Sequence, residues 1–294
     1  MAGVTGVAGT TGVAGVTGTG RAGGAAGMAG MAGVTRVTAL GDLAWPQAQR
    51  LAAAGAMLAV PVGSTEQHGP HLPLSTDTDI AAALAARLAA RRADVVVAPP
   101  LGYGSSGEHA GFAGTISIGQ HALELTLLEL GRSAADTFGH ILFLCAHGGN
   151  REPAARAVAR LRSESVDAVL WMAGDAPARP RPRRSASSAI ARLMLRLNGR
   201  RTPDGDAHAG RTETAIQLAL DPGRVLMSRA EAGNRAPIAG LMPLLQAAGV
   251  RAASRNGVLG DPSGASAAEG AELLAALTAD LLAAVAAWRG PGPG

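Results

Sequence analysis

Short apolar runs alternate along the chain with longer segments of helical periodicity. The apolar runs predict buried strands at residues 57–62, 94–98, 140–145 and 168–172. Helical spacing and Ala/Leu-rich composition predict helices at residues 43–54, 79–92, 121–138, 152–163, 212–220 and 266–288. Strands that alternate with long helices are typical of a mostly parallel sheet covered by helices on both faces. The pattern therefore predicts an α/β fold.

Three segments fall outside this alternation. Residues 1–35 repeat Gly, Ala, Val and Thr, and such a tract buries too little surface to offset its entropy, so a disordered tail is expected. Residues 176–185 are rich in Pro and Arg and predict a loop, which a predicted helix at 185–197 follows. No break in composition divides the remainder, so residues 36–290 are expected to form one domain.

Composition excludes several classes of protein. The 294-residue sequence contains no lysine, which rules out a Schiff-base lysine and a Walker-type phosphate lysine. A net charge of +4 and an aromatic content of 2% argue against nucleic-acid binding. The only cysteine, Cys145, excludes an intramolecular disulfide and favours the reducing cytoplasm. Without an uninterrupted run of 18 apolar residues, no membrane-spanning helix is expected.

The densest group of polar residues comes directly after the first predicted strand. Glu66 and His68 are two positions apart, which places both side chains on one face of an extended segment. Asp77, at the start of the next helix, can reach the same point. Carboxylates with an imidazole suit Zn, Fe or Mn. The alternative is that Asp77 and Asp79 only cap that helix.

Two later segments add similar side chains. His147 comes directly after the third strand and precedes Gly-Gly-Asn, which allows a sharp turn toward the crevice where sites of open α/β sheets form. His208 lies in a predicted loop, and Glu213 stands at the start of a helix. A glutamate at a helix N-terminus can also be only a favourable charge on the helix dipole. This last segment is therefore the weakest signal by itself.

The order of these segments resembles the creatininase family of metal-dependent amidohydrolases. The matching motifs are G-S-T-E-Q-H-G-P-H-L-P at 63–73 with D-T-D at 77–79, G-S-S-G-E-H at 104–109, H-G-G-N at 147–150 and D-A-H-A-G-R-T-E-T at 206–214. The resemblance covers roughly residues 38–285. It implies a three-layer α/β/α fold, two divalent metal ions per subunit (Zn, Fe(II) or Mn) and homo-oligomers, often hexamers.

The resemblance also implies a role for each residue. Glu66 and His147 match ligands of one metal, His68 matches a ligand of the other, and Asp77 matches the bridging carboxylate. His208 matches the catalytic histidine. Creatininase itself has a glutamate two residues after the ligand histidine, where this chain has Gly149. Glu213 is the expected replacement, both as a metal ligand and as part of the catalytic set.

Within the family, the chain is most similar to the branch of peptidases in mycofactocin maturation. That branch is known for releasing a modified C-terminal Val-Tyr dipeptide unit from a ribosomally made precursor peptide, which would be the substrate here. On this interpretation Glu108 and His109 contact the substrate or the ligands, or else form a structural pair. The arginines of the Pro/Arg loop bind a peptide carboxylate or are only solvated; these are Arg179, Arg181, Arg183 and Arg184.

Two alternatives to peptide hydrolysis stay open at this point. The chain could be another creatininase-like amidohydrolase that acts on a cyclic amide or a formamide. It could also be a non-catalytic scaffold or binding subunit that kept the fold. The retention of Glu66, His68, Asp77 and His147 argues against the scaffold, because burying such charges without a metal is costly.

Overall fold

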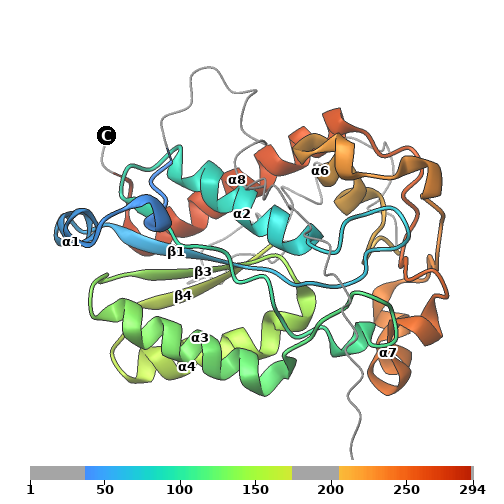
Figure 1. The fold of residues 1–294 in the computed structure, drawn as a ribbon, viewed down its shortest axis with the longest axis horizontal. Coiled ribbons are helices and arrows are strands. Elements are labelled where there is room, and N and C mark those ends of the chain that lie inside the picture. The colour runs from blue at the N-terminus through green and yellow to red at the C-terminus, as the bar shows by residue number, and fades with distance from the viewer. Residues whose placement is uncertain (1–36, 174–204, 293–294) are drawn as a thin grey trace, which may run out of the picture. The chain divides into compact units, whose positions relative to one another are not determined.

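A computed structural model describes residues 37–173 and 205–292 of the chain. Within these residues, four strands form a parallel sheet in the order β2-β1-β3-β4; Figure 1 shows β1, β3 and β4 side by side. They are β1 (Met57–Val62), β2 (Val95–Val97), β3 (Ile141–Cys145) and β4 (Ala168–Met172). All four lie within the runs that the hydrophobic pattern predicts. The expectations for the tail at 1–35, the Pro/Arg loop and the helix at 185–197 lie outside the described residues.

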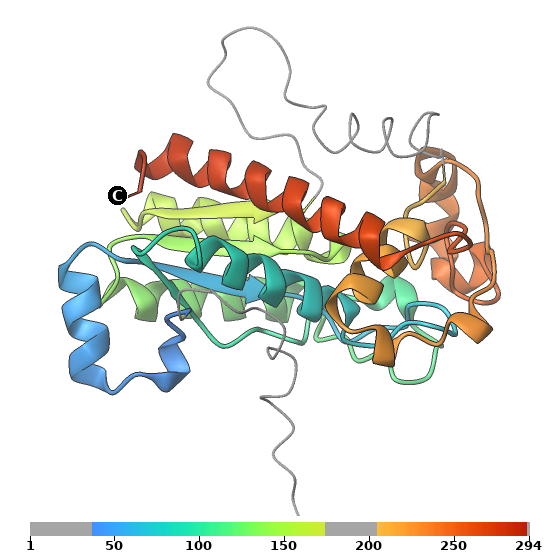
Figure 2. The same cartoon turned by 90° about the horizontal axis from the view of Figure 1, so that it is seen from above.

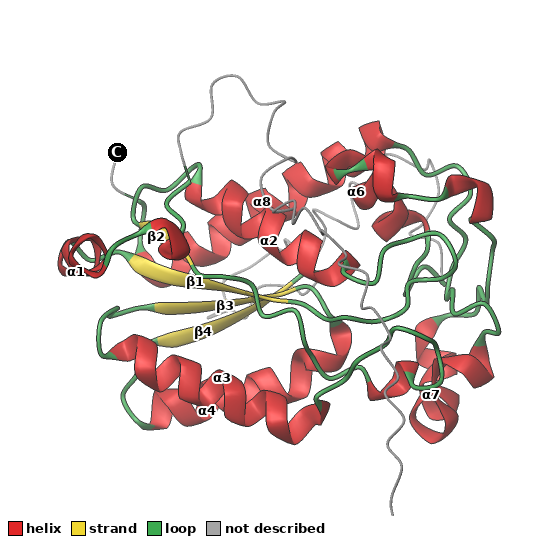
Figure 3. Ribbon diagram, in the orientation of Figure 1, coloured by secondary structure: helices red, strands yellow, loops and turns green. Residues whose placement is uncertain are grey.

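Helices cover both faces of the sheet, as Figures 2 and 3 show. One face carries α2 (Thr76–Ala89), α6 (Arg211–Leu220) and α8 (Ala267–Arg289). The other carries α1 (Trp45–Ala53), α3 (Gly119–Ala135) and α4 (Arg151–Ser163). Because successive side chains of a strand point to opposite faces, Met57 and Ala59 enter the first core while Leu58 and Val60 enter the second. The predicted three-layer α/β/α arrangement is confirmed.

The pattern missed one long helix, α7 (Ile238–Ala253). Gly240, Pro243 and Gly249 interrupt its apolar spacing, and the backbone at Gly249 is not helical, with φ at 74°. Among the described residues, five short 3₁₀ turns, too brief to carry a periodic signal, were also not predicted. They are Leu40–Asp42, Gly107–His109, Gly148–Asn150, Pro222–Arg224 and Met227–Arg229.

Helix α8 closes the fold beside α2 and α6. In the part of the chain that the structure describes, it is the one helix long and apolar enough to cross a membrane. That property is weak support for a membrane span, because the core helix of a globular protein meets the same criterion. Leu273, Leu274 and Leu277 of α8 are buried in the core on the α2 face of the sheet. The packing accounts for the apolar character of α8.

A tight contact between α6 and α8 predicts a stability effect. A Cβ atom added at Gly270 of α8 would lie 1.8 Å from the carbonyl oxygen of Ala215 in α6. We expect Gly270→Ala to destabilise the protein by about 1–3 kcal/mol, because overpacking forces the helices apart. Thermal unfolding of the variant and the wild type measures this difference in stability. Gly240→Ala is the control, since a Cβ there meets no described atom within 4 Å. A Gly270→Ala protein as stable as the wild type would contradict the close packing.

Candidate metal centre

Parallel pairing brings the first two polar segments to one place. Val62, the last residue of β1, pairs in register with Cys145, the last residue of β3. The segments after these two residues therefore leave the same edge of the sheet, at its carboxyl end. Ser64 accepts at its carbonyl oxygen from the hydroxyl of Thr78 at 2.9 Å, which ties the start of α2 to the first segment. Glu66, His68, Asp77 and His147 thus converge.

One candidate triad consists of Glu66, Asp77 and His147. Their ligand atoms lie within 4.8 Å of one another, and all three residues are buried. Nδ1 of His147 is 3.1 Å from Oδ2 of Asp77, and its Nε2 is 3.2 Å from Oε2 of Glu66. Two carboxylates and an imidazole in this arrangement could hold a divalent cation.

A second candidate triad shares Asp77 with the first and adds His68 and Glu213. Nε2 of His68 lies 3.3 Å from Oδ1 of Asp77 and 3.9 Å from Oε2 of Glu213. Glu213 thus places a carboxylate beside His68, at a centre where Gly149 has no side chain to offer. The same oxygen accepts the backbone N–H of Ala209 at 2.6 Å, which ties Glu213 to the segment just before α6. Asp77 is not the N-cap residue of α2, which is Ser75.

Polar neighbours hold these side chains in place. Nδ1 of His68 lies 3.2 Å from the carbonyl oxygen of Glu66, which requires an N–H there and leaves Nε2 facing the carboxylates. Nε2 of His147 lies 2.9 Å from the carbonyl oxygen of Ser105. The hydroxyl of Ser64 donates to Oδ2 of Asp77 at 2.7 Å. Such partners orient the imidazoles and carboxylates that bind metals in other proteins.

The buried carboxylates and imidazoles of the two triads shift one another's pKa values. Burial alone would lower the pKa of His68 and of His147, but the surrounding carboxylates outweigh burial and raise each pKa to about 10. Burial alone would raise the pKa of Asp77, yet the two imidazoles lower it well below its usual range. The carboxylates therefore demand compensating positive charge, which protons supply when no metal is bound.

Glu66 provides the sharpest test of whether a metal fits here. Its carboxylate is fully buried, and neither oxygen accepts a well-aligned hydrogen bond from the described residues; the imidazole of His147, 3.2 Å from Oε2, is an ion-pair contact. Burial raises its pKa to about 7, although the charge of His147 opposes that rise. An orphaned buried carboxylate is costly unless a cation compensates it. The donor set and the orphaned oxygens of Glu66 together fit a metal site.

Two further histidines flank Glu66. Nδ1 of His208 lies 3.8 Å from Oε1 of Glu66, and Nε2 of His109 lies 3.4 Å from the same atom. Burial lowers the pKa of His109 to about 3 and that of His208 well below its usual range, so both rings stay neutral. His208 also forms a possible ligand group with Glu66 and His68. A proton-transfer role is open to His208 because its ring is neutral and adjacent to both triads.

Glu108 occupies the space left by the missing glutamate. A Cβ atom at Gly149 would lie 2.4 Å from Oε1 of Glu108, 2.2 Å from the carbonyl oxygen of Ser105 and 2.6 Å from Nε2 of His147. Oε1 of Glu108 is itself 3.8 Å from Nε2 of His147. Residue 149 must therefore be glycine for the Glu108 carboxylate to approach the first triad.

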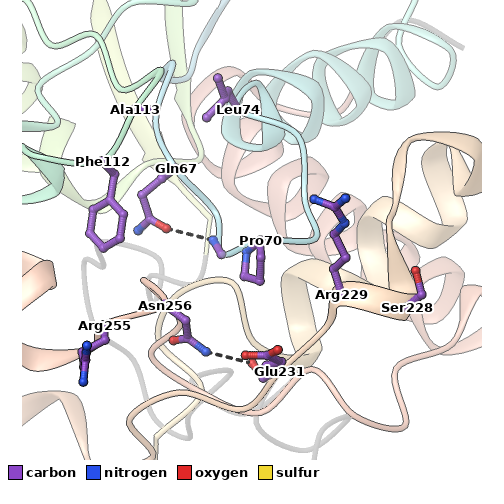
Figure 4. A pocket seen from close by; sticks show the side chains of 11 residues that line it. Gln67, Pro70, Leu74, Phe112, Ala113, Ser228, Arg229, Glu231, Arg255 and Asn256 are labelled. Carbon is purple, nitrogen blue, oxygen red and sulfur yellow. Dashed lines mark hydrogen bonds between the residues drawn. The ribbon is translucent and has the colours of Figure 1, made fainter.

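The centre opens into a cavity of about 1230 Å³. Its walls include Met242 and Leu245 of α7 together with Glu66, Asp77, His147, His208 and Glu213. A separate pocket of about 520 Å³ is bordered by Gln67, Phe112, Arg229 and Asn256, among others (Figure 4). The larger cavity has room for a peptide segment beside both triads.

The structure thus brings together all six residues named as site candidates from the sequence. Glu108 and His109 also reach the site, where each faces a triad residue. Sequence analysis did not single out Gln67, whose buried side chain contacts His109 and His208. Its position between the candidate ligands Glu66 and His68 was the sequence feature that could have identified it. Arg179, Arg181, Arg183 and Arg184 lie outside the described residues.

The shared use of Asp77 leads to a prediction for Glu213. We expect Glu213→Gln to lower metal binding at the second triad. The first triad, Glu66, Asp77 and His147, should still bind its metal ion, so the protein should retain about half of its metal. Metal analysis of the purified variant measures this, and Glu272→Gln, an exposed position on α8, is the control. A Glu213→Gln protein with full metal content would exclude Glu213 as a ligand.

Comparisons with known proteins agree with this geometry. A family model described as "Creatinine amidohydrolase" matches residues 41–285.

Two relatives of this chain are called mycofactocin precursor peptide peptidase. The one from Mycolicibacterium smegmatis is 48% identical, over 74% of this chain and 80% of its own length. The one from Mycobacterium ulcerans is 42% identical, over 86% and 94%. A solved creatininase variant is 25% identical with a TM-score of 0.71, covering 87% of this chain and 100% of its own. The chain therefore belongs to the creatininase family.

Proposed function

We propose that this chain is a metal-dependent peptidase that releases the modified C-terminal Val-Tyr dipeptide unit of the mycofactocin precursor peptide by hydrolysing an amide bond. The observation that carries the proposal is a pair of triads sharing Asp77 in a cavity of about 1230 Å³. Relatives that share up to 48% identity are named for this activity. Residues 36–290 would form the hydrolase domain, which the family match at 41–285 supports.

We assign the first metal to Glu66, Asp77 and His147 and the second to His68, Asp77 and Glu213. When bound, two divalent cations polarise an amide carbonyl and lower the pKa of a nearby water. The mixed N/O donor set is compatible with Zn, Fe(II) and Mn. Creatininases of this fold include a manganese form and a Zn-Zn form.

His208 would move the proton that hydrolysis requires. The reaction breaks the C–N bond of the amide; the water oxygen ends on the carbonyl carbon, and one water proton ends on the leaving amine. Nε2 of His208 lies 2.8 Å from the carbonyl oxygen of Gln67 and 3.1 Å from the side-chain nitrogen of the same residue, so Gln67 holds the ring in place. Nδ1 lies 3.8 Å from Oε1 of Glu66, and we propose that it accepts the water proton and returns it to the amine.

The direct test uses the full-length protein, a modified precursor peptide and mass spectrometry. We expect release of the C-terminal dipeptide, its loss after chelation of metals, and recovery when Zn²⁺, Mn²⁺ or Fe²⁺ is added singly. Ring opening of a cyclic amide or loss of formate, with the precursor left intact, would instead favour another amidohydrolase. Full activity in protein shown by elemental analysis to be metal-free would overturn the metal-dependent mechanism.

Two further assignments belong to this proposal. We propose that the protein works as a homo-oligomer, as the family resemblance implies, with a hexamer as the first assembly to test by light scattering. We also propose a reducing compartment such as the cytoplasm. The support is that the sequence has a single cysteine, Cys145, and so has no intramolecular disulfide of the kind common in oxidising compartments.

A further inference from the structure

Helix α7, labelled in Figure 1, is held in place beside the metal centre. Leu241 of α7 packs with Leu259 in a small buried apolar cluster, and the backbone N–H of Leu259 donates to the carbonyl oxygen of His208 at 2.8 Å. Nearer the end of α7, a Cβ atom at Gly249 would lie 2.7 Å from the carbonyl oxygen of Glu108. These contacts hold α7 against two segments that carry residues of the metal centre.

Three apolar side chains of α7 line the cavity of the metal centre. Ile238, Met242 and Leu245 are four and three positions apart, which places them on one face of the helix. Ile238 is 42% exposed and Met242 is 41% exposed, so this face keeps apolar surface in water until a ligand covers it. None of the α7 residues that line the cavity is charged. Exposed apolar surface inside a cavity is typical of a ligand-binding site.

The cavity lining therefore combines two kinds of chemistry. The triads contribute carboxylates and imidazoles, whereas α7 contributes aliphatic and thioether groups. A ligand that matches both has a polar group for the metal centre and apolar groups beside it. An amide bond next to an aliphatic and an aromatic side chain meets this description. A formamide or a small cyclic amide would leave much of a cavity of about 1230 Å³, and with it the α7 face, in contact with water.

We propose that Ile238, Met242 and Leu245 form the subsite that binds the valine and tyrosine side chains of the C-terminal unit while the amide bond before that unit lies at the metal centre. The inference rests on the proposed peptidase function, because it concerns how the same cavity selects its substrate. It accounts for the exposed apolar face of α7, which the substrate covers. Selection then depends on burial of apolar surface and needs no charged group from α7.

Binding to the subsite is tested without cleavage. The full-length protein, loaded with Zn²⁺ and labelled with ¹³C-methyl methionine, is titrated with Val-Tyr-amide and separately with Gly-Gly-amide, which has no apolar side chains. We expect a saturable shift of the Met242 methyl signal in NMR spectra with Val-Tyr-amide and not with Gly-Gly-amide. Met227 is the internal control, because it is similarly exposed but does not line the cavity. Met242→Leu and Met227→Leu variants assign the two signals.

Kinetics with the modified precursor peptide provide the second measurement. We expect Met242→Gln to raise KM about 10-fold with kcat nearly unchanged, because glutamine keeps the length of the side chain but loses the apolar contact with the substrate. Leu244→Gln is the matched control, since Leu244 lies on the same helix and is also 41% exposed but does not line the cavity. We expect the KM of this control to equal that of the wild type.

The outcomes separate this inference from the proposed function. If Val-Tyr-amide shifts the Met242 signal no more than the Met227 signal, or no more than Gly-Gly-amide does, the inference is wrong, even where Met242→Gln does not fold. A KM of Met242→Gln equal to that of Leu244→Gln would contradict it as well. If Val-Tyr-amide shifts the Met242 signal selectively but the precursor peptide stays intact, the apolar subsite is supported and only the proposed function fails.

Discussion

Asp77→Asn is expected to remove metal from both triads and to lower hydrolysis more than about 100-fold. Asp77 is the carboxylate that the two triads share. Loss of a residue that only orients a ligand typically costs 10- to 100-fold in metal affinity or activity, so loss of the shared ligand should cost more. The replacement also removes the negative charge that His68 and His147 both face. Elemental analysis and the dipeptide-release assay measure the two effects.

Asp79→Asn is the matched control for Asp77→Asn. Asp79 lies in the same first turn of α2, but its carboxylate accepts from Ser75 and pairs with Arg224 near the surface. We expect this variant to keep its metal and its activity, since a partly exposed ion pair contributes little. If Asp77→Asn retained wild-type metal content, the assignment of a shared carboxylate would be wrong.

Gly149→Ala is expected to damage the first triad and to destabilise the protein by about 1–3 kcal/mol. The new Cβ would lie 2.2 Å from the carbonyl oxygen of Ser105, which is the acceptor that holds Nε2 of His147. It would also lie 2.4 Å from Oε1 of Glu108. Displacement of the carbonyl should lower activity about 10–100-fold, as for other partners of metal ligands.

The adjacent glycine supplies the control for Gly149→Ala. A Cβ atom at Gly148 would meet no described atom within 4 Å, so Gly148→Ala adds the same methyl group to the same turn without a clash. We expect Gly148→Ala to match the wild type in metal content, melting temperature and rate. If Gly149→Ala and Gly148→Ala had the same metal content, melting temperature and rate, Glu108 and Ser105 would not lie close enough to residue 149 to exclude a side chain there.

Local patterns predicted most of the fold and part of the site. The apolar runs were sufficient for β1 to β4 because buried parallel strands need near-continuous apolar residues. Helix α7 was missed because Gly240, Pro243 and Gly249 break the periodicity that identifies a helix. The start of α2 was predicted at residue 79 but lies at Thr76, since capping signals place helix ends only to within a few residues.

The sequence by itself determined which side chains were available and where the strands end. Glu66, His68 and His147 come soon after apolar strands, and parallel strands bring the loops at their carboxyl ends to one edge of the sheet. Glu213 is different, because in its own segment it cannot be distinguished from a carboxylate that only caps α6. The packing of α6 against α2 and α8 placed it beside His68.

Only the tertiary structure decided how the second metal site could be completed without a glutamate at residue 149. Glu108 fills the volume beside Gly149, and Glu213 approaches His68 from another element. The contacts of Gln67 with His109 and His208 likewise join residues far apart in the chain. The physical reason is that distances of a few ångströms between distant segments are set by packing, which no local pattern encodes.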